Sequence, residues 1–152
     1  MLDQILQLLT GADKRPSTGS TDALQIAVAA LLVEAARMDD HFDAAERSVI
    51  LRQLSERFAL SSEATGRLLA SAERAADQST GLFRFTQLVV ERLNPEERVR
   101  IVEMLWEVAY AHGVLDPAED ALVRRVAGLI FVSDKDRGAA RSRVLRRLGV
   151  RG

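Results

Sequence analysis

The segment at residues 23–38, ALQIAVAALLVEAARM, constrains the fold more than any other part of the chain. Only Gln25, Glu34 and Arg37 within it are polar, so a helix formed by this segment is apolar on nearly every side. Such a helix has no face to expose to water and is stable only when other helices surround it. We therefore expect this segment to be the central helix of a helical protein.

The rest of the chain carries helix signals as well. Alanine and leucine are abundant and aromatic residues make up only 5%, which favours helices over sheets. No stretch alternates between apolar and polar residues as a strand would. We predict an all-α bundle of seven or eight helices with short connections. The expected helix N-caps are Thr21 or Asp22, Asp43, Ser61, Ser79, Asn94, Asp116 and Ser133.

The chain divides into a short N-terminal segment and one domain. Residues 1–20 contain leucines at helical spacing followed by a stretch rich in Pro, Gly and Ser, which predicts a helix and a linker. Residues 21–150 then form a single helical domain, which suits a chain of 152 residues. The chain shows neither signal-peptide features nor an apolar run long enough to span a membrane, so we expect a cytoplasmic protein.

Several classes of chemistry are absent from the sequence. There is no cysteine, which excludes disulfides, thiolate metal ligands and a cysteine nucleophile. No P-loop, dinucleotide fingerprint or nucleophile elbow is present, so we expect no enzyme activity. A net charge of -1 gives no drive toward nucleic acid. We expect the protein to act through a protein partner that the sequence does not identify, and a homodimer remains open.

An internal repeat relates two parts of the chain. EAARMDDHFDAAERSVI, at residues 34–50, aligns with EVAYAHGVLDPAEDALV, at residues 107–123. Two helix-turn-helix units of one design predict a pseudo-symmetric bundle in which the apolar helices that precede the two turns pack together. The acidic positions that coincide are Glu34 with Glu107, Asp43 with Asp116, and Glu46 with Glu119.

The repeated turn resembles the turns of TerB-like domains, named for the bacterial tellurite-resistance protein TerB. Related domains also occur in a membrane-anchored DnaJ-type co-chaperone. The resemblance covers roughly residues 20–135 and implies an all-helical fold with two helix pairs, a stress-related role, and acids that hold a divalent cation. This chain has Asp40 where the family has Gly, and His112 where the family has Asp. These departures make the first turn the stronger candidate site.

The acidic residues have two interpretations, which the sequence leaves open. Asp43 with Glu46, and Asp116 with Glu119, have the spacing of a helix-capping box, which needs no metal. Asp39 and Asp40, however, follow the C-terminal end of a helix, where the macrodipole disfavours acids. A bound Ca²⁺ or Mg²⁺ would offset that repulsion with oxygen ligands. The candidate ligands are Asp39, Asp40, Asp43, Glu46, Asp116 and Glu119, with Glu34 and Glu107 one helical turn before each motif.

Other residues carry weaker signals. Glu34 and Glu107 are interpreted either as partly exposed side chains or as inward carboxylates that bridge the two halves. His41 and His112 are one position out of register in the repeat, so the sequence assigns them no shared ligand role and no zinc site is expected. The arginine-rich end, residues 137–151, predicts an amphipathic helix with a solvated basic face, which fits docking on the bundle. The alternative is a contact for an acidic partner, nucleic acid or a membrane surface.

Overall fold

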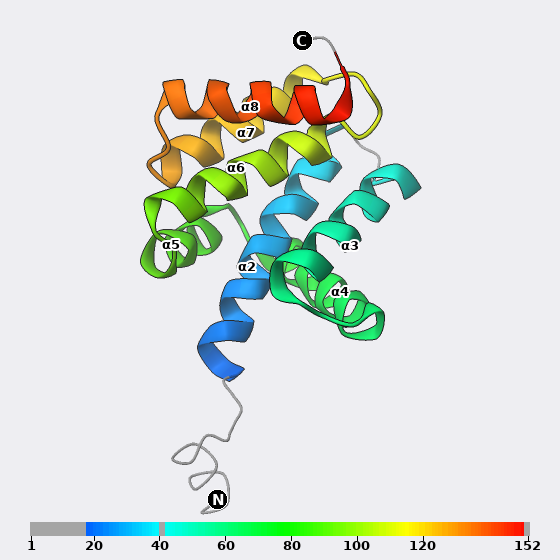
Figure 1. Cartoon of the computed structure of the whole chain (residues 1–152). Coiled ribbons are helices and arrows are strands. Elements are labelled where there is room, and N and C mark those ends of the chain that lie inside the picture. The colour runs from blue at the N-terminus through cyan, green and yellow to red at the C-terminus, as the bar shows by residue number, and fades with distance from the viewer. Residues whose placement is uncertain (1–17, 40–41, 151–152) are drawn as a thin grey trace, which may run out of the picture.

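Helix α2 (Thr18–Ala36) runs through the middle of the molecule, and the other helices lie around it (Figure 1). Every residue from Ala27 to Val33 is at most 1% exposed. α2 packs against α3, α4, α5, α6 and α7. The expectation that the most apolar segment forms a surrounded central helix is therefore confirmed.

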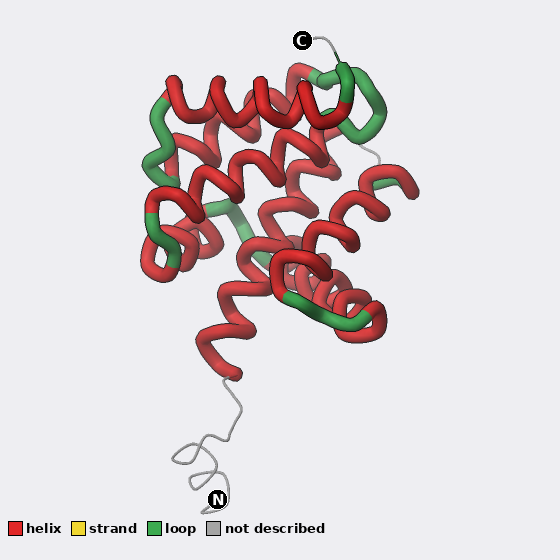
Figure 2. Tube along the Cα trace, viewed as in Figure 1, coloured by secondary structure: helices red, strands yellow, loops and turns green. Residues whose placement is uncertain are grey.

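The computed structural model describes residues 18–39 and 42–150, and the predicted helix near the N-terminus lies outside them. The described residues form helices and loops without a strand (Figure 2), so the all-α prediction is confirmed. No helix among them is long and apolar enough to cross a membrane. After α2 come η1 (Arg37–Asp39), α3 (Ala44–Phe58), α4 (Ser62–Gln78), α5 (Phe83–Arg92), α6 (Pro95–Ala109), α7 (Pro117–Leu129) and α8 (Asp134–Leu148).

Most predicted helix starts are confirmed by side-chain caps. In each case the capping oxygen accepts a hydrogen bond from a backbone N–H of the first turn, a group that has no partner within the helix. The confirmed caps are Asp43, Ser61, Asn94, Asp116 and Ser133.

Two predicted starts are wrong. α2 begins at Thr18, before the expected caps Thr21 and Asp22. Ser79 ends α4 instead of starting α5, because its hydroxyl donates to the carbonyl oxygen of Gly81 at 2.6 Å within a tight turn. α5 then begins at Phe83 without a side-chain cap. Both errors come from placing a helix start at a side chain able to cap it: Thr21 and Asp22 lie inside α2, and Ser79 lies before the start of α5.

The two repeat units interlock. α2 packs against α6, as the repeat predicted, and each of these helices leads into a turn and a second helix, α3 or α7. The second helices cross over to the opposite unit: α3 packs against α6, and α7 packs against α2 and η1. Each turn therefore belongs to one unit of the repeat while the helix after it contacts the other.

Helix α8 docks along α6 and covers the bundle on that side (Figure 1). Arg143 and Arg147 both form ion pairs with Glu103 of α6, at 2.7 and 3.2 Å. The structure thus shows the amphipathic docking that was one interpretation of the arginine-rich end. The apolar side chains that α8 buries are Ala140, Val144 and Leu145.

Truncation of the central helix should be far more costly than truncation at the surface. Leu31→Ala removes a side chain that is 0% exposed, and we expect the free energy of unfolding to fall by about 2–5 kcal/mol. Leu148→Ala, at a position that is 40% exposed, should cost less than half as much. Chemical denaturation of both variants measures the difference, and equal losses would contradict the central position of α2.

Candidate metal centre

Asp43 and Glu46 form a complete capping box at the start of α3. The Oδ1 atom of Asp43 accepts a hydrogen bond from the backbone N–H of Glu46 at 3.0 Å. In return, the Oε1 atom of Glu46 accepts one from the backbone N–H of Asp43 at 3.3 Å. The cap interpretation of this pair is therefore confirmed, and it fixes the position of both carboxylates.

The second oxygen of each carboxylate faces His112, which comes from the other turn of the repeat. Asp43 Oδ2 lies 3.2 Å from His112 Nδ1, and Glu46 Oε2 lies 3.1 Å from His112 Nε2. The cap and the cluster with the histidine use different oxygens of the same two carboxylates. The helix-cap interpretation and the metal-ligand interpretation of Asp43 and Glu46 are therefore compatible, because each uses a different oxygen of the same carboxylate.

The chain after α6 brings His112 to this position. α6 ends at Ala109, and Tyr110 follows as its C-cap. Gly113 then adopts a φ of +85°, in the left-handed region that glycine reaches without steric cost. The backbone N–H of Gly113 donates to the carbonyl oxygen of Tyr110 at 2.8 Å and closes a tight turn that contains His112, whose ring contacts the capping box.

Asp43, Glu46 and His112 lie close enough together for one ion to contact all three. One ligand atom from each residue can be chosen so that all lie within 4.8 Å of one another, and no other group of three or more potential ligands does so in the described part of the chain. The side chain of Glu46 is 0% exposed, whereas those of His112 and Asp43 are 30% and 40% exposed. A cation held here would therefore have protein ligands on its inner side and water on its outer side.

The donor set is mixed, with carboxylate oxygens and one imidazole nitrogen. Carboxylates suit Mg²⁺, Ca²⁺ and Mn²⁺, and imidazole suits transition metals such as Zn²⁺. A protonated imidazole can donate to both carboxylates, one from each ring nitrogen. A divalent cation would instead take one nitrogen of the neutral ring, and its two positive charges would balance both carboxylates. These residues fit a divalent cation, with a ligand set that differs from the all-oxygen set expected from sequence.

The ligands expected from sequence do not include His112, because the two histidines, compared with each other, are one position out of register in the repeat. The repeat does contain a signal that points to it. His112 stands at the repeat position of Asp39, just as Asp116 stands at that of Asp43. This equivalence places His112 where the family pattern has an acid, but only the crossing of the units shows which carboxylates it meets.

The other predicted ligands of the two turns do not belong to this cluster. Asp40 lies outside the described residues, as does the side chain of Asp39, whose backbone belongs to η1. Asp116 caps α7 by accepting a hydrogen bond from the N–H of Ala118 at 2.7 Å, without a complete capping box. Glu119 is fully buried and has an interaction partner. A cation at the second turn stays a prediction.

Glu107 connects the two repeat units and is not part of the Asp43–Glu46–His112 cluster. Its carboxylate on α6 pairs with Arg52 of α3 and accepts a hydrogen bond from Gln53 Nε2 at 3.2 Å. Gln53 also donates to the carbonyl oxygen of Met104 at 3.0 Å. These contacts connect α3 to α6 along the same interface that carries the cluster.

Glu34, at the equivalent position of α2, is half-buried. Desolvation by burial raises the pKa of its carboxyl above the ordinary 4.5; nearby Arg37 partly opposes this, and Asp77 adds to it. Arg37 forms its ion pair with Asp77, at 2.7 Å. Glu34 therefore lies outside the ligand cluster, in an environment that disfavours its charged form.

The fold and the cluster define a class of protein: an all-helical module of two interlocked helix pairs, with an acidic cap and a histidine where the units meet. A family model described as "Tellurite resistance protein TerB" matches residues 25–142. The match covers well over half of the chain, so the protein belongs to the TerB family. No curated protein and no solved structure gives a significant match to the chain.

The raised pKa of Glu34 predicts a pH-dependent loss of stability. The folded protein holds the Glu34 proton more tightly than the unfolded chain does. The stability that this tighter binding contributes is therefore fully present below about pH 4.5, and it is lost as the pH rises through the pKa of Glu34 in the folded state. Glu34→Gln removes the charged form. We expect the free energy of unfolding of the variant, relative to that of the parent protein, to be higher at pH 7 than at pH 4. Urea denaturation of both proteins at the two pH values measures this difference.

The control for this experiment is Glu63→Gln, at a side chain of α4 that is 85% exposed. Its stability relative to the parent protein should not rise between pH 4 and pH 7, because Glu63 lies in the first turn of α4 and pairs with Arg67. If Glu34→Gln behaves like this control, burial does not perturb the Glu34 carboxyl in the way that its environment indicates.

Proposed function

We propose that this protein is a non-enzymatic TerB-family module whose Asp43–Glu46–His112 cluster binds a divalent cation, and that it acts through contacts with a protein partner. The family description supports a role in a stress response of the tellurite-resistance kind. We further propose that the protein works in the cytoplasm. The cluster is the feature on which the cation-binding part of this proposal depends.

One observation carries the proposal: hydrogen bonds to one oxygen of each carboxylate hold it in place, and the other oxygen faces the proposed cation position. Asp43 Oδ1 and Glu46 Oε1 are engaged in the capping box, and Oδ2 and Oε2 face His112. Hydrogen bonds that fix ligands in advance lower the cost of ordering them when a metal binds. An exposed group of acids without such bonds would have to be ordered by the cation itself.

A cation in this cluster would connect the two repeat units. Asp43 and Glu46 begin α3 of the first unit, and His112 follows α6 of the second. A ligand that binds only the folded state stabilises that state. Binding would therefore strengthen the contact between the units and hold the surface around both turns in one arrangement, which is how we propose that it influences a partner.

A second function has support from the same distances. His112 already lies 3.2 and 3.1 Å from the two carboxylates, so a protonated imidazole would bridge them without a metal. In that case the module would be a metal-independent adaptor, or a co-chaperone-like interaction domain, with the cluster as a structural link. Cation titration separates the two functions.

We expect divalent cations to raise the melting temperature of the metal-free protein. Mn²⁺ and Zn²⁺ should act at lower concentration than Mg²⁺ or Ca²⁺, because the set contains an imidazole nitrogen. Differential scanning fluorimetry and isothermal titration calorimetry measure both effects. If none of these cations produces heat or a shift in melting temperature at millimolar concentration, the cation-binding part of the proposal is wrong.

Variants that keep the cap and remove the charge test the site directly. Asn and Gln preserve the capping oxygens, so Asp43→Asn and Glu46→Gln should keep the helix start. Each variant should nevertheless weaken cation binding at least about tenfold, because a charged ligand is lost. The matched control is Glu97→Gln, which makes the same change in the capping box of Asn94, outside the cluster. If this control loses as much affinity as Glu46→Gln, the site is not the one that we propose.

A further inference from the structure

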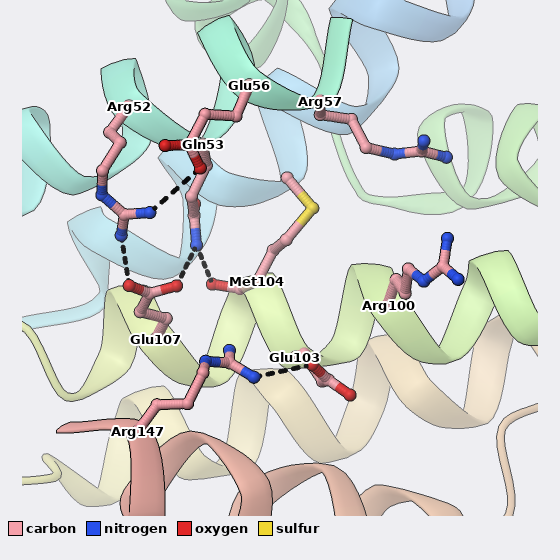
Figure 3. Close-up of a pocket in the computed structure, with 9 residues that line it drawn as sticks. All are labelled: Arg52, Gln53, Glu56, Arg57, Arg100, Glu103, Met104, Glu107 and Arg147. Atoms are coloured by element: carbon pink, nitrogen blue, oxygen red, sulfur yellow. Dashed lines mark hydrogen bonds and ion pairs between the residues drawn. The ribbon is translucent and has the colours of Figure 1, made fainter. Parts of the chain in front are cut away.

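A groove of about 480 Å³ lies between α3 and α6, with the C-terminal part of α8 along one side (Figure 3). Four arginines line it from three helices: Arg52 and Arg57 of α3, Arg100 of α6, and Arg147 of α8. Three glutamates of α3 and α6 line it as well. The distribution of these charges along the groove decides what it can bind.

One end of the groove is neutralised by ion pairs. Arg52 lies between two carboxylates, pairing with Glu107 across the groove and with Glu56 at 3.4 Å along its own helix. Arg147 pairs with Glu103 at 3.2 Å. Every glutamate of the lining is thus engaged with an arginine, and this end offers little net charge to a ligand.

The other end is formed by Arg57 and Arg100, which extend from opposite walls toward the same space (Figure 3). Among the described residues, neither arginine has a carboxylate within ion-pairing distance. The guanidinium carbon of Arg57 lies 5.9 Å from the ring centroid of Phe58, a contact that leaves the positive charge in place. The groove is therefore polarised, with its uncompensated positive charge at this end.

One polar atom at this end of the groove is buried with no hydrogen-bond partner from the described residues. The Nε atom of Arg57 is buried and makes no hydrogen bond within the described part of the chain. A buried donor without an acceptor costs free energy comparable to a lost hydrogen bond. A guanidinium group presents its N–H donors in a planar fork that matches the two oxygens of a carboxylate. An oxyanion between Arg57 and Arg100 would accept hydrogen bonds from the terminal N–H groups of both guanidinium groups and balance both charges.

The shape of the groove favours a chain over a small free anion. Small ligands bind in sites that enclose most of their surface, whereas the rim of this groove is exposed at Arg52, Arg100 and Arg147. The side chain of Met104 offers an apolar contact between the charged and the neutralised ends. A segment with an acidic side chain at one end and uncharged residues behind it matches this arrangement.

We propose that Arg57 and Arg100 form an oxyanion site that takes an acidic side chain of a partner peptide laid along the α3–α6 groove. This proposal deepens the protein-interaction part of the proposed function, on which it rests, and it is independent of cation binding. The experiment is therefore run on the full chain with EDTA and again with Mn²⁺. Binding in EDTA supports the groove even if the cation site fails.

The probe is a fluorescein-labelled peptide of alternating glutamate and alanine residues, measured by fluorescence anisotropy. The same peptide with glutamine in place of glutamate serves as the uncharged control, and inorganic phosphate serves as the small-anion competitor. We expect the acidic peptide to bind, the glutamine peptide to bind at least about tenfold more weakly because the charged hydrogen bonds are lost, and phosphate to compete only at much higher concentration. Phosphate binding without peptide binding would overturn the proposal.

Variants locate the site. Arg100→Gln changes an exposed residue and leaves the fold intact, and we expect it to weaken peptide binding about tenfold, as should Arg57→Gln. Arg146→Gln makes the same change in charge on α8, at an exposed residue outside the groove, and should leave binding nearly unchanged. If all three variants lose affinity equally, general electrostatic attraction explains the binding and the site is wrong. If neither groove variant loses affinity, it is wrong as well.

Discussion

The structure depends on the enclosure of α2, a helix that has no polar face. Ala27 through Val33 are shielded from water, because α3, α4, α5, α6 and α7 all pack against α2, whereas α8 covers α6. α6, the equivalent helix of the second unit, packs against α2, while α3 and α7 cross to the opposite unit. This crossing brings the turn that follows α6 against the start of α3. The site is therefore a consequence of how two apolar helices are buried together.

The capping box at Asp43 shows how one pair of acids can have two roles. One oxygen of each carboxylate completes the helix start, and the other faces a histidine that is distant in sequence. The box at Asn94 and Glu97 has the same hydrogen bonds, yet it is not part of any cluster of ligands in the described residues. A capping box alone therefore does not indicate a metal site. The group brought against it from another part of the fold makes the difference.

Much of the fold could be predicted from the sequence, because helix type and most helix starts are local properties. The apolar run of α2, the caps at Asp43 and Asn94, and the repeat were sufficient for the all-α fold and its two units. Local signals failed at Ser79, where two helix ends compete for one side chain. The site was predicted only in part. Asp43 and Glu46 are readable as candidates, but their meeting with His112 depends on the tertiary crossing of the units, which no residue spacing encodes.

The interface between α3 and α6 carries both features that we interpret functionally. The Asp43–Glu46–His112 cluster lies where α3 begins, and the groove lies farther along α3, with the ion pair of Glu107 and Arg52 at its neutralised end. The central claim is that a cation binds where the two units meet. Anomalous diffraction from crystals grown with Mn²⁺ tests it most directly. The account predicts an anomalous peak bonded to the carboxylates of Asp43 and Glu46 and to the His112 ring; a peak bound elsewhere, or none at saturating Mn²⁺, would contradict it.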